Sequence, residues 1–230
     1  SDLIIEISKI DKIKRIRYTT SHPIDFSEDL IEAHKKVDKL MPLIHLPIQS
    51  GSDKILKKMN RKHSVEFYLK LIKKLKLVNN RVEFSSDFII GYPGETDQDF
   101  FSTIKLLKEI KFINTYSFIF SSRPGTPAAN MKKIDENISK ERLAIFQKLA
   151  KEIKMNYRKN CLNKKSLVLF ENSISNKNIY FGRDEYFNSV IVKSTENLKG
   201  KIREVKIIDG NQGSLFGQLV QNKNNEEFAA

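Results

Sequence analysis

The residues best suited to chemistry lie in the segment Phe84–Thr96, which reads Phe-Ser-Ser-Asp-Phe-Ile-Ile-Gly-Tyr-Pro-Gly-Glu-Thr. Val82 to Ile90 is rich in β-branched and aromatic residues and ends in glycine and proline, which predicts a buried strand that enters a tight loop. Ligands of parallel sheets bind beyond the carboxyl ends of the strands, so Asp87 and the loop Gly91–Glu95 are candidate binding groups. The alternative is structural: Asp87 orients the loop, and the glycines only permit the turn.

Three other segments place polar or aromatic side chains near predicted strand ends. Gln49 and Ser50 follow a predicted strand at 43–48, and their neutral side chains suit hydroxyls or a ribose. His22 follows a predicted strand at 14–20 and is either an acid, base or ligand, or a turn residue with one hydrogen bond. The predicted strand at 114–120 carries aromatic residues on one face. Core packing explains them most simply, and the alternative is that Phe118 lines the pocket of a flat ligand.

Helices are expected to alternate with these strands. The clearest helix start is Thr96, followed by Asp99 and an apolar series at helical spacing, which indicates a capped amphipathic helix. Further helices are predicted at 2–10, after Ser27, at 53–59, after Ser64 and at 139–161. Four such alternations predict an α/β fold with a parallel sheet and right-handed crossovers.

The pattern changes beyond Lys165 to five short strands, at 167–170, 179–182, 189–192, 201–208 and 214–220, with turns at 176–177, 209–210 and 212–213. This pattern predicts a small antiparallel β-barrel, followed by a disordered polar tail. The domains are therefore expected at 1–163 and 164–221, with the tail at 222–230. Such barrels often bind oligonucleotides, although some aromatic residues must fill the interior. The candidate contacts are Tyr180, Phe181, Arg183, Tyr186 and Phe187.

The formal net charge of +13 favours a polyanionic partner, although a lysine-rich sequence also arises from an AT-rich genome. Residues 139–165 include nine basic and two acidic residues. This concentration of positive charge on one predicted helix favours contact with RNA or DNA. Lysines spread over other helices more often form a solvated surface. The residues that we expect to contact RNA are Arg142, Lys151, Arg158, Lys165, Arg183, Lys201 and Arg203.

Composition also bears on the location of the protein and on the metal sites that it can form. No apolar run is long enough for a membrane span, and no signal peptide precedes the first helix, so a cytoplasmic location is expected. The single cysteine, Cys161, cannot form an internal disulfide and cannot alone hold zinc or an iron–sulfur cluster. We therefore expect no metal site built from the residues of this chain.

The motifs together resemble a known family. They are Arg17-Tyr-Thr-Thr-Ser-His-Pro23, His45-Leu-Pro-Ile-Gln-Ser-Gly-Ser-Asp53, Met59-Asn-Arg61, Ser85–Thr96, Tyr116-Ser-Phe-Ile-Phe and Arg123-Pro-Gly-Thr-Pro-Ala128. This combination is similar to the radical-SAM methylthiotransferases, and most similar to the tRNA 2-methylthio-N6-isopentenyladenosine synthases. Gly182-Arg183 and Ser214–Val220 resemble the TRAM domain of that family.

The resemblance implies a partial (β/α) barrel that binds S-adenosylmethionine and an iron–sulfur cluster, followed by an RNA-binding TRAM barrel. It implies an enzyme that adds a methylthio group to C2 of N6-isopentenyladenosine beside the tRNA anticodon. A sulfur donor and an electron donor are further implied partners. The residues expected near S-adenosylmethionine by position are Gln49, Ser50, Asp87, Ile89, Gly91 and Phe118.

The chain also departs from the family pattern. The family's Cys-x-x-x-Cys-x-x-Cys segment and its N-terminal domain with three more cysteines, which together hold two 4Fe–4S clusters, have no counterpart here, and Cys161 matches neither set. We therefore expect a C-terminal fragment that is inactive alone and binds the cofactor poorly. An incomplete sheet would also leave an edge that favours self-association. The alternatives are a methylthiotransferase of threonylcarbamoyladenosine or of a ribosomal-protein aspartate, and a non-catalytic RNA-binding module.

Overall fold

A computed structural model describes residues 1–19, 22–174, 178–220 and 227–228. The chain forms two compact units, and neither is a single continuous segment. Unit 1 consists of Ser1–Tyr18, Glu32–Leu43 and Met155–Ala230, and unit 2 consists of Thr19–Ile31 and Ile44–Lys154. Unit 1 joins the N-terminal segment to the C-terminal strands, so the two units do not correspond to the expected domains. The domain division expected at residue 164 stays a prediction.

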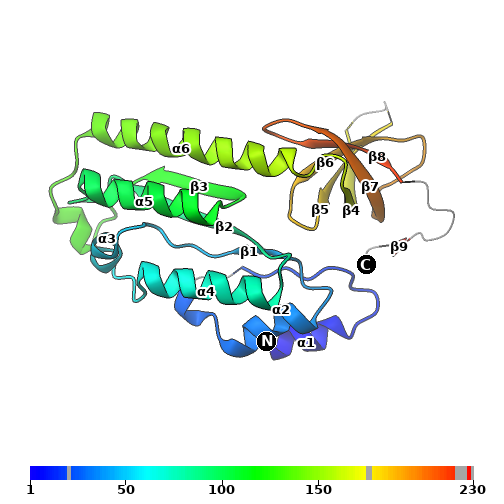
Figure 1. The fold of residues 1–230 in the computed structure, drawn as a ribbon, viewed down its shortest axis with the longest axis horizontal. Helices are drawn as coiled ribbons and strands as arrows, with labels where there is room; N and C mark the ends of the chain where they lie inside the picture. Colours follow the sequence, from blue (N-terminus) through cyan, green and yellow to red (C-terminus); the bar gives the residue numbers. More distant parts are fainter. Residues whose placement is uncertain (20–21, 175–177, 221–226, 229–230) are drawn as a thin grey trace. The chain divides into compact units, whose positions relative to one another are not determined.

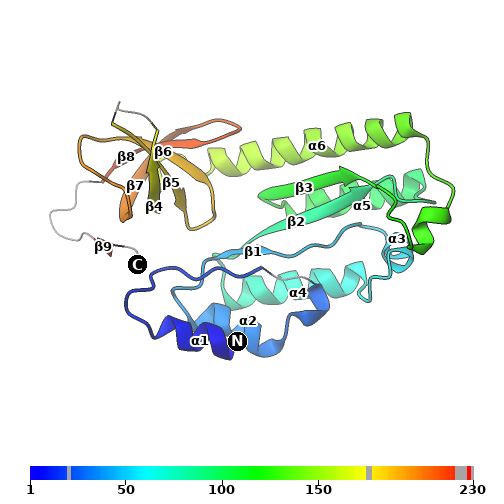
Figure 2. The same cartoon turned by 180° about the vertical axis from the view of Figure 1, so that it is seen from behind.

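Unit 2 is built on a three-stranded sheet in the order β1-β2-β3, formed by β1 (Leu43–His45), β2 (Glu83–Ile90) and β3 (Asn114–Ile119). Strands β2 and β3 are parallel, with Asp87 opposite Tyr116 and Ile89 opposite Phe118. Helices α4 (Val65–Val78) and α5 (Asp97–Ile110) lie over one face of the sheet (Figure 1). The view from behind shows the opposite face, with the strands in front of these helices (Figure 2).

The helix predictions hold because their caps and apolar stripes are strong local signals. Thr96 and Asp99 form the expected capping box at the start of α5, and Ser64 caps α4. The apolar stripe of α4 is buried as predicted, including Tyr68 and Leu75. The remaining helices are α1 (Asp2–Ser8), η1 (Pro23–Asp25), α2 (Glu28–Lys36), α3 (Asp53–Lys58), η2 (Pro127–Asn130) and α6 (Glu136–Lys159).

The parallel sheet is smaller than predicted. The segment expected as a strand at 14–20 makes one isolated bridge, between Ile16 and Leu40, and Thr20 lies outside the described residues. Strand β1 ends at His45, two residues before a proline, and pairing resumes with a single bridge between Gln49 and Phe88. The proline lacks a backbone N–H and interrupts the ladder there.

Unit 1 contains the predicted five-stranded barrel, made of β4 (Lys165–Ser173), β5 (Ile179–Asp184), β6 (Ser189–Lys193), β7 (Lys201–Gly210) and β8 (Leu215–Leu219). The strands follow the order β4-β5-β6-β8-β7, and pairing between β4 and β7 closes the barrel. One expectation was wrong: β6 and β8 are parallel rather than antiparallel. The interior is apolar and is filled by residues such as Val168, Phe170, Val190 and Val205.

The C-terminal tail is only partly described. Glu227–Phe228 forms a two-residue strand, β9, against β7, which corrects the expectation of a disordered tail at these two positions. The remaining tail residues from 221 onward, and the turn predicted at 176–177, lie outside the described residues. Within the described ranges, no helix is long and apolar enough to span a bilayer.

Candidate functional site

The face of β2 and β3 away from α4 and α5 carries the candidate site. Along β2, Phe88 and Ile90 are fully buried, whereas the alternating Asp87 and Ile89 are only partly buried. Their partners across the ladder on β3 are Tyr116 and Phe118, which are 54% and 60% exposed. Side chains of paired residues point to the same face, so a carboxylate, an aliphatic side chain and two aromatic rings share one open surface.

This arrangement corrects the expectation that the aromatic residues of β3 pack in the core. Only Phe120 does so, in a cluster with Tyr92, where the two ring centroids lie 4.9 Å apart. The period of two correctly placed Tyr116 and Phe118 on one face, but the helices cover the other face of the sheet. The alternative reading, an aromatic side chain that lines a binding surface, is the one compatible with their exposure.

A polar cluster lies on the same face beside Tyr116. His45 Nδ1 lies 2.9 Å from Ser85 Oγ, and its Nε2 lies 3.5 Å from Asp87 Oδ1. The His45 ring meets Tyr116 edge-on, with ring centroids 6.0 Å apart. Burial lowers the pKa of Arg61, and the charge of Asp87 opposes this shift, so this guanidinium lies within electrostatic range of the carboxylate. Asp87 is thus a hydrogen-bond acceptor held among cationic and aromatic groups.

Gln49 is tied to this surface through its backbone. Its N–H donates to the Asp87 carbonyl, and its carbonyl accepts from the Ile89 N–H, each at 3.0 Å. Its φ of 77° lies in the left-handed region, which is uncommon for a residue other than glycine and often marks a functional position. The backbone geometry therefore fixes Gln49 next to both residues predicted to contact the cofactor.

Ser50 is buried, and its expected place near the cofactor stays a prediction. It is 1% exposed, and its Oγ lies 3.4 Å from Thr103 Oγ1 and accepts from the Ser52 N–H at 3.2 Å. These contacts join the segment after β1 to helix α5. A buried hydroxyl must find hydrogen-bond partners inside the protein, and these contacts supply them for Ser50.

Gly91 begins the loop after β2 and is fixed by a buried carboxylate. Its φ is 73°, its N–H donates to Glu95 Oε2 at 2.9 Å, and an added Cβ would lie 2.5 Å from Ser139 Oγ. Arg142 Nη1 bonds the same carboxylate oxygen at 2.9 Å, and its Nη2 lies 2.7 Å from Asp97 Oδ1. Burial raises the pKa of Glu95, while the Gly91 N–H and Arg142 oppose the rise.

This ion pair also corrects the prediction that Arg142 contacts RNA. Arg142 is 7% exposed, and its guanidinium is used to hold the loop after β2. Arg158 is likewise buried, and it donates to the carbonyls of Asn211 and Gly213 within unit 1. Positive charge counted along a helix does not distinguish such buried arginines from exposed ones.

The other predicted RNA contacts are more accessible. Lys151 is exposed, and Lys165 is exposed but paired with Glu204 at 2.9 Å. Lys201 and Arg203 both pair with Glu196, which lowers their value as free cations. The guanidinium of Arg183 lies 4.1 Å from the centroid of the half-exposed Phe187 ring.

His22 has the turn role that we gave as its alternative. Its Nδ1 accepts a hydrogen bond from the Ile24 N–H at 3.3 Å and so caps η1. Its ring also meets that of His63 edge-on at 4.9 Å. Sequence reasoning included Glu95 in the candidate loop but missed His45 and Arg61 as members of the site. The only signal for these two residues was their position in the motifs 45–53 and 59–61.

The surface fits part of the expected cofactor and not all of it. Phe118 offers a ring face to a flat heterocycle, Ile89 an apolar wall, and Asp87 an acceptor for hydroxyl or amino groups, which suits S-adenosylmethionine. A cluster that needs three thiolates does not fit, because the chain has one cysteine. Among the described residues, no group of three or more His, Cys, Asp or Glu side chains is arranged to hold a metal ion.

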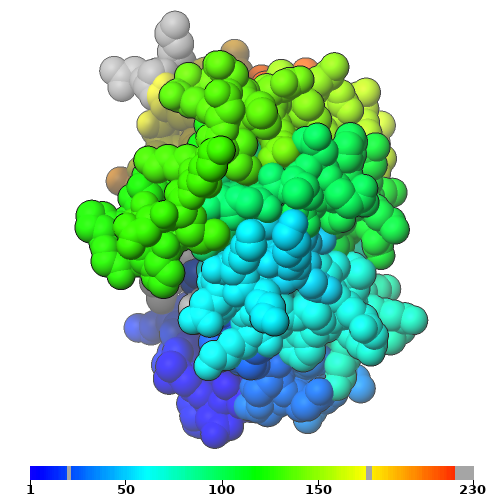
Figure 3. Space-filling view, turned by 90° about the vertical axis from the view of Figure 1, so that its left-hand side faces the viewer, coloured from blue at the N-terminus to red at the C-terminus, as the bar shows by residue number. Residues whose placement is uncertain are grey.

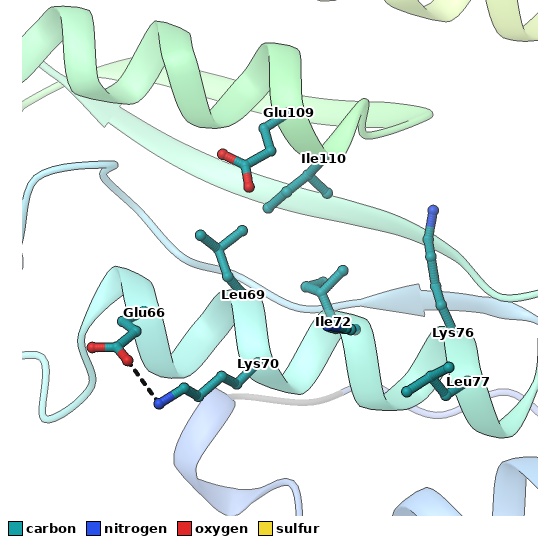
Figure 4. Close-up of a pocket in the computed structure, with 9 residues that line it drawn as sticks. Glu66, Leu69, Lys70, Ile72, Lys76, Leu77, Glu109 and Ile110 are labelled. Carbon is teal, nitrogen blue, oxygen red and sulfur yellow. Dashed lines mark ion pairs between the residues drawn. The ribbon is translucent and has the colours of Figure 1, made fainter.

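The loops that follow β2 and β3 lie at the carboxyl ends of these strands in unit 2. In Figure 3, residues 121–135, in green, lie beside the cyan segment that contains α3. Ala128 from this loop packs against Ile55 of α3. A separate groove of about 500 Å³ lies on the helical face, between α4 and α5, and is lined by Leu69, Ile72 and Ile110 (Figure 4). It is remote from the site residues, because it lies on the other side of the sheet.

Comparisons with known proteins found similarity along most of the chain. A family model described as the radical SAM superfamily matches residues 1–107, which include β1, β2 and the loop after β2. This part of the chain is similar to the radical SAM superfamily. The chain also resembles a solved structure of coproporphyrinogen III oxidase (HemN) from Escherichia coli, a radical SAM enzyme, with a TM-score of 0.54 and 11% identity. That similarity covers 89% of this chain and 50% of HemN and concerns the fold alone.

Relatives extend the similarity over nearly the whole sequence. The chain is 52% identical over 221 residues to tRNA-2-methylthio-N(6)-dimethylallyladenosine synthase of Pelagibacter ubique. It is 45% identical over 222 residues to the protein of the same name from Wolbachia sp. subsp. Brugia malayi. These matches cover 96% and 95% of this chain and 50% of each relative. The chain thus spans about half the length of the curated relatives that it matches.

Proposed function

We propose that this chain is part of a radical-SAM transferase that adds a methylthio group to C2 of N6-isopentenyladenosine next to the anticodon of tRNA. The observation that carries the proposal is 52% identity to a named synthase of this type over 96% of the chain. The open face of β2 and β3 supports it, because its aromatic and carboxylate groups suit an adenosyl ligand. The barrel of unit 1, which we propose to be TRAM-like, would serve as the RNA-binding part.

The residues of this chain would bind and orient S-adenosylmethionine, which supplies the radical chemistry when bound. Phe118 would stack on the adenine, and Ile89 would pack beside it. Asp87 would accept hydrogen bonds from ribose hydroxyls, with Gln49 adjacent to it. Gly91 would keep its loop close to the cofactor, held by Glu95.

The whole enzyme would use two 4Fe–4S clusters, a sulfur donor and an electron donor. This chain has a single cysteine, which cannot hold either cluster. We propose that the isolated chain is inactive for this reason. The enzyme would act on tRNA in the cytoplasm, and the uncovered edge of the sheet would permit self-association of the isolated chain.

A chimera tests the proposal directly. This chain replaces the matching half of the Pelagibacter ubique relative, and the chimera is expressed in a bacterium that lacks its own tRNA methylthiotransferases. Mass spectrometry of digested tRNA is expected to show 2-methylthio-N6-isopentenyladenosine. Methylthiolated threonylcarbamoyladenosine, or a methylthiolated ribosomal-protein aspartate, would instead support one of the alternative substrates. Absence of any methylthiolated product, with the chimera folded and loaded with iron, would refute the enzymatic proposal.

A further inference from the structure

The loop between β5 and β6 in unit 1 holds an aromatic residue in an unusual position. Asp184 is 2% exposed, and its Oδ1 accepts hydrogen bonds from the N–H groups of Tyr186 and Asn188, at 2.9 and 2.8 Å. Its Oδ2 accepts from the Asn188 side-chain amide at 2.9 Å. These bonds fix Phe187 at a φ of 62°, in the left-handed region, with its side chain turned outward and 45% exposed. Such a conformation is disfavoured for a bulky residue unless the surrounding structure enforces it.

Two arginines lie against this ring. The guanidinium carbon of Arg183 lies 4.1 Å from the Phe187 centroid, and that of Arg17 lies 5.0 Å from it. Arg17 comes from the N-terminal segment, and its Nη2 donates to the carbonyls of Asp184 and Glu185, at 3.1 and 2.7 Å. Two guanidinium groups from distant parts of the sequence therefore lie close to this aromatic ring.

The carboxylates of Asp184 and Glu185 lie within electrostatic range of Arg15 and Arg17. Arg15 donates to the carbonyls of Leu167 and Arg183, at 2.8 and 2.9 Å. Backbone carbonyls accept hydrogen bonds but carry no net charge, so these contacts orient Arg15 and Arg17 without neutralising them. Arg183 has a carboxylate neighbour, Glu171, only at 3.6 Å. The loop thus combines a fixed, half-exposed ring with guanidinium groups whose charge the nearby carboxylates partly offset.

We propose that Phe187, together with Arg17 and Arg183, is a stacking platform for one unpaired RNA nucleobase. A base has a flat π-face that stacks on an aromatic ring or a guanidinium plane, and its phosphate is attracted by the arginines. A base within a duplex is already stacked, so the platform selects single-stranded loops over paired stems. The inference rests on the proposed tRNA-modifying function and deepens it by naming where a loop base binds and by adding Arg17 to the RNA surface.

The test compares two RNAs with the full 230-residue chain. One is a short hairpin with an unpaired loop, and the other is a blunt duplex with the same number of phosphates. Fluorescence anisotropy gives both affinities at several salt concentrations. The parent chain is expected to prefer the hairpin. Phe187→Ala is expected to weaken hairpin binding about tenfold or more and duplex binding less than about twofold, since the duplex offers no base to stack.

Controls separate stacking from charge and from folding. Phe187→Tyr keeps a ring and should bind the hairpin like the parent, whereas Arg17→Lys keeps the charge but loses the plane and should weaken hairpin binding several-fold. Phe67, which is 42% exposed on α4, provides a matched aromatic control, and Phe67→Ala should change neither affinity. Phe187→Gly removes the ring and relieves the left-handed strain, so it should lose hairpin preference without loss of thermal stability.

The possible outcomes are distinct. Equal affinity of the parent and Phe187→Ala for the hairpin would overturn the platform while leaving RNA binding intact. An equal loss on hairpin and duplex would also overturn it, because the ring would then act only through the fold. If the parent chain bound neither RNA, the platform and the proposed RNA-binding role of this chain would fail together.

Discussion

Replacing Arg142 with methionine tests the buried ion pair that holds the loop after β2. Methionine preserves the stem of Arg142 but leaves the carboxylate of Glu95, whose side chain is 0% exposed, without its cationic partner. Removal of one member of a buried pair costs about 3 to 5 kcal/mol, because the other charge stays buried. At about 2 to 4 °C per kcal/mol for a chain of this size, the melting temperature should fall by roughly 10 °C.

Differential scanning calorimetry at several pH values measures this loss. The pKa of Glu95 is raised by burial, so protonation favours the folded state, and stability from this group declines as pH rises through its folded pKa. The deficit of Arg142→Met should therefore shrink as the pH is lowered from 7 toward the range in which Glu95 becomes neutral. The double variant with Glu95→Gln should recover a large part of the deficit at neutral pH. A loss below about 1 kcal/mol at pH 7, or a deficit independent of pH, would refute the reasoning.

Three further perturbations test contacts within the two units. Burial lowers the pKa of His34 to about 4, so the free energy of unfolding should decline by about 3 kcal/mol as the pH falls from 6.5 toward 4. Urea denaturation at several pH values measures this decline, and His34→Gln should reduce it. An unchanged dependence of stability on pH in His34→Gln would contradict the prediction. Thr96→Ala removes the hydroxyl of the capping box and should cost about 1 kcal/mol in thermal melts monitored by circular dichroism, whereas Thr96→Ser should be nearly neutral; equal losses would exclude a capping role. Gly51→Ala would place a Cβ 2.5 Å from Thr103 Cα and should lower the free energy of unfolding by about 3 kcal/mol. In the control variant Gly213→Ala, the nearest neighbour of the added Cβ lies at 3.5 Å, and the loss should be less than about 1 kcal/mol. Similar stabilities of the two variants would contradict the close approach of α5 to Gly51.

Local signals in the sequence were sufficient to predict most elements. The capping box at Thr96, the apolar stripe of α4 and the five barrel strands each depend on residues close in sequence, and the structure contains all of them. The strands that carry Asp87 and Tyr116 were also predicted, although their register was not. These features could be predicted because the side-chain period of a helix or strand sets which residues share a face.

Features that depend on distant partners were not predictable in the same way. Alternation placed Tyr116 and Phe118 on one face but did not indicate which face the helices cover. Arg142 and Arg158 were grouped with exposed lysines, since nothing local to α6 reveals Glu95 or the carbonyl of Asn211 as partners. The parallel pairing of β6 with β8 likewise depends on the path of β7 between them and not on either strand alone.

The central claim is that the open face of β2 and β3 holds S-adenosylmethionine, with Phe118 against the adenine. Its most direct test is the affinity of the purified, cluster-loaded chimera for S-adenosylmethionine, measured by equilibrium dialysis for Phe118→Ala and for Phe101→Ala, which removes a ring of similar exposure from α5. Phe118→Ala is expected to weaken binding about tenfold, which corresponds to loss of one stacked ring, whereas Phe101→Ala should leave the affinity unchanged. Equal affinities of Phe118→Ala and the parent chimera would contradict the claim.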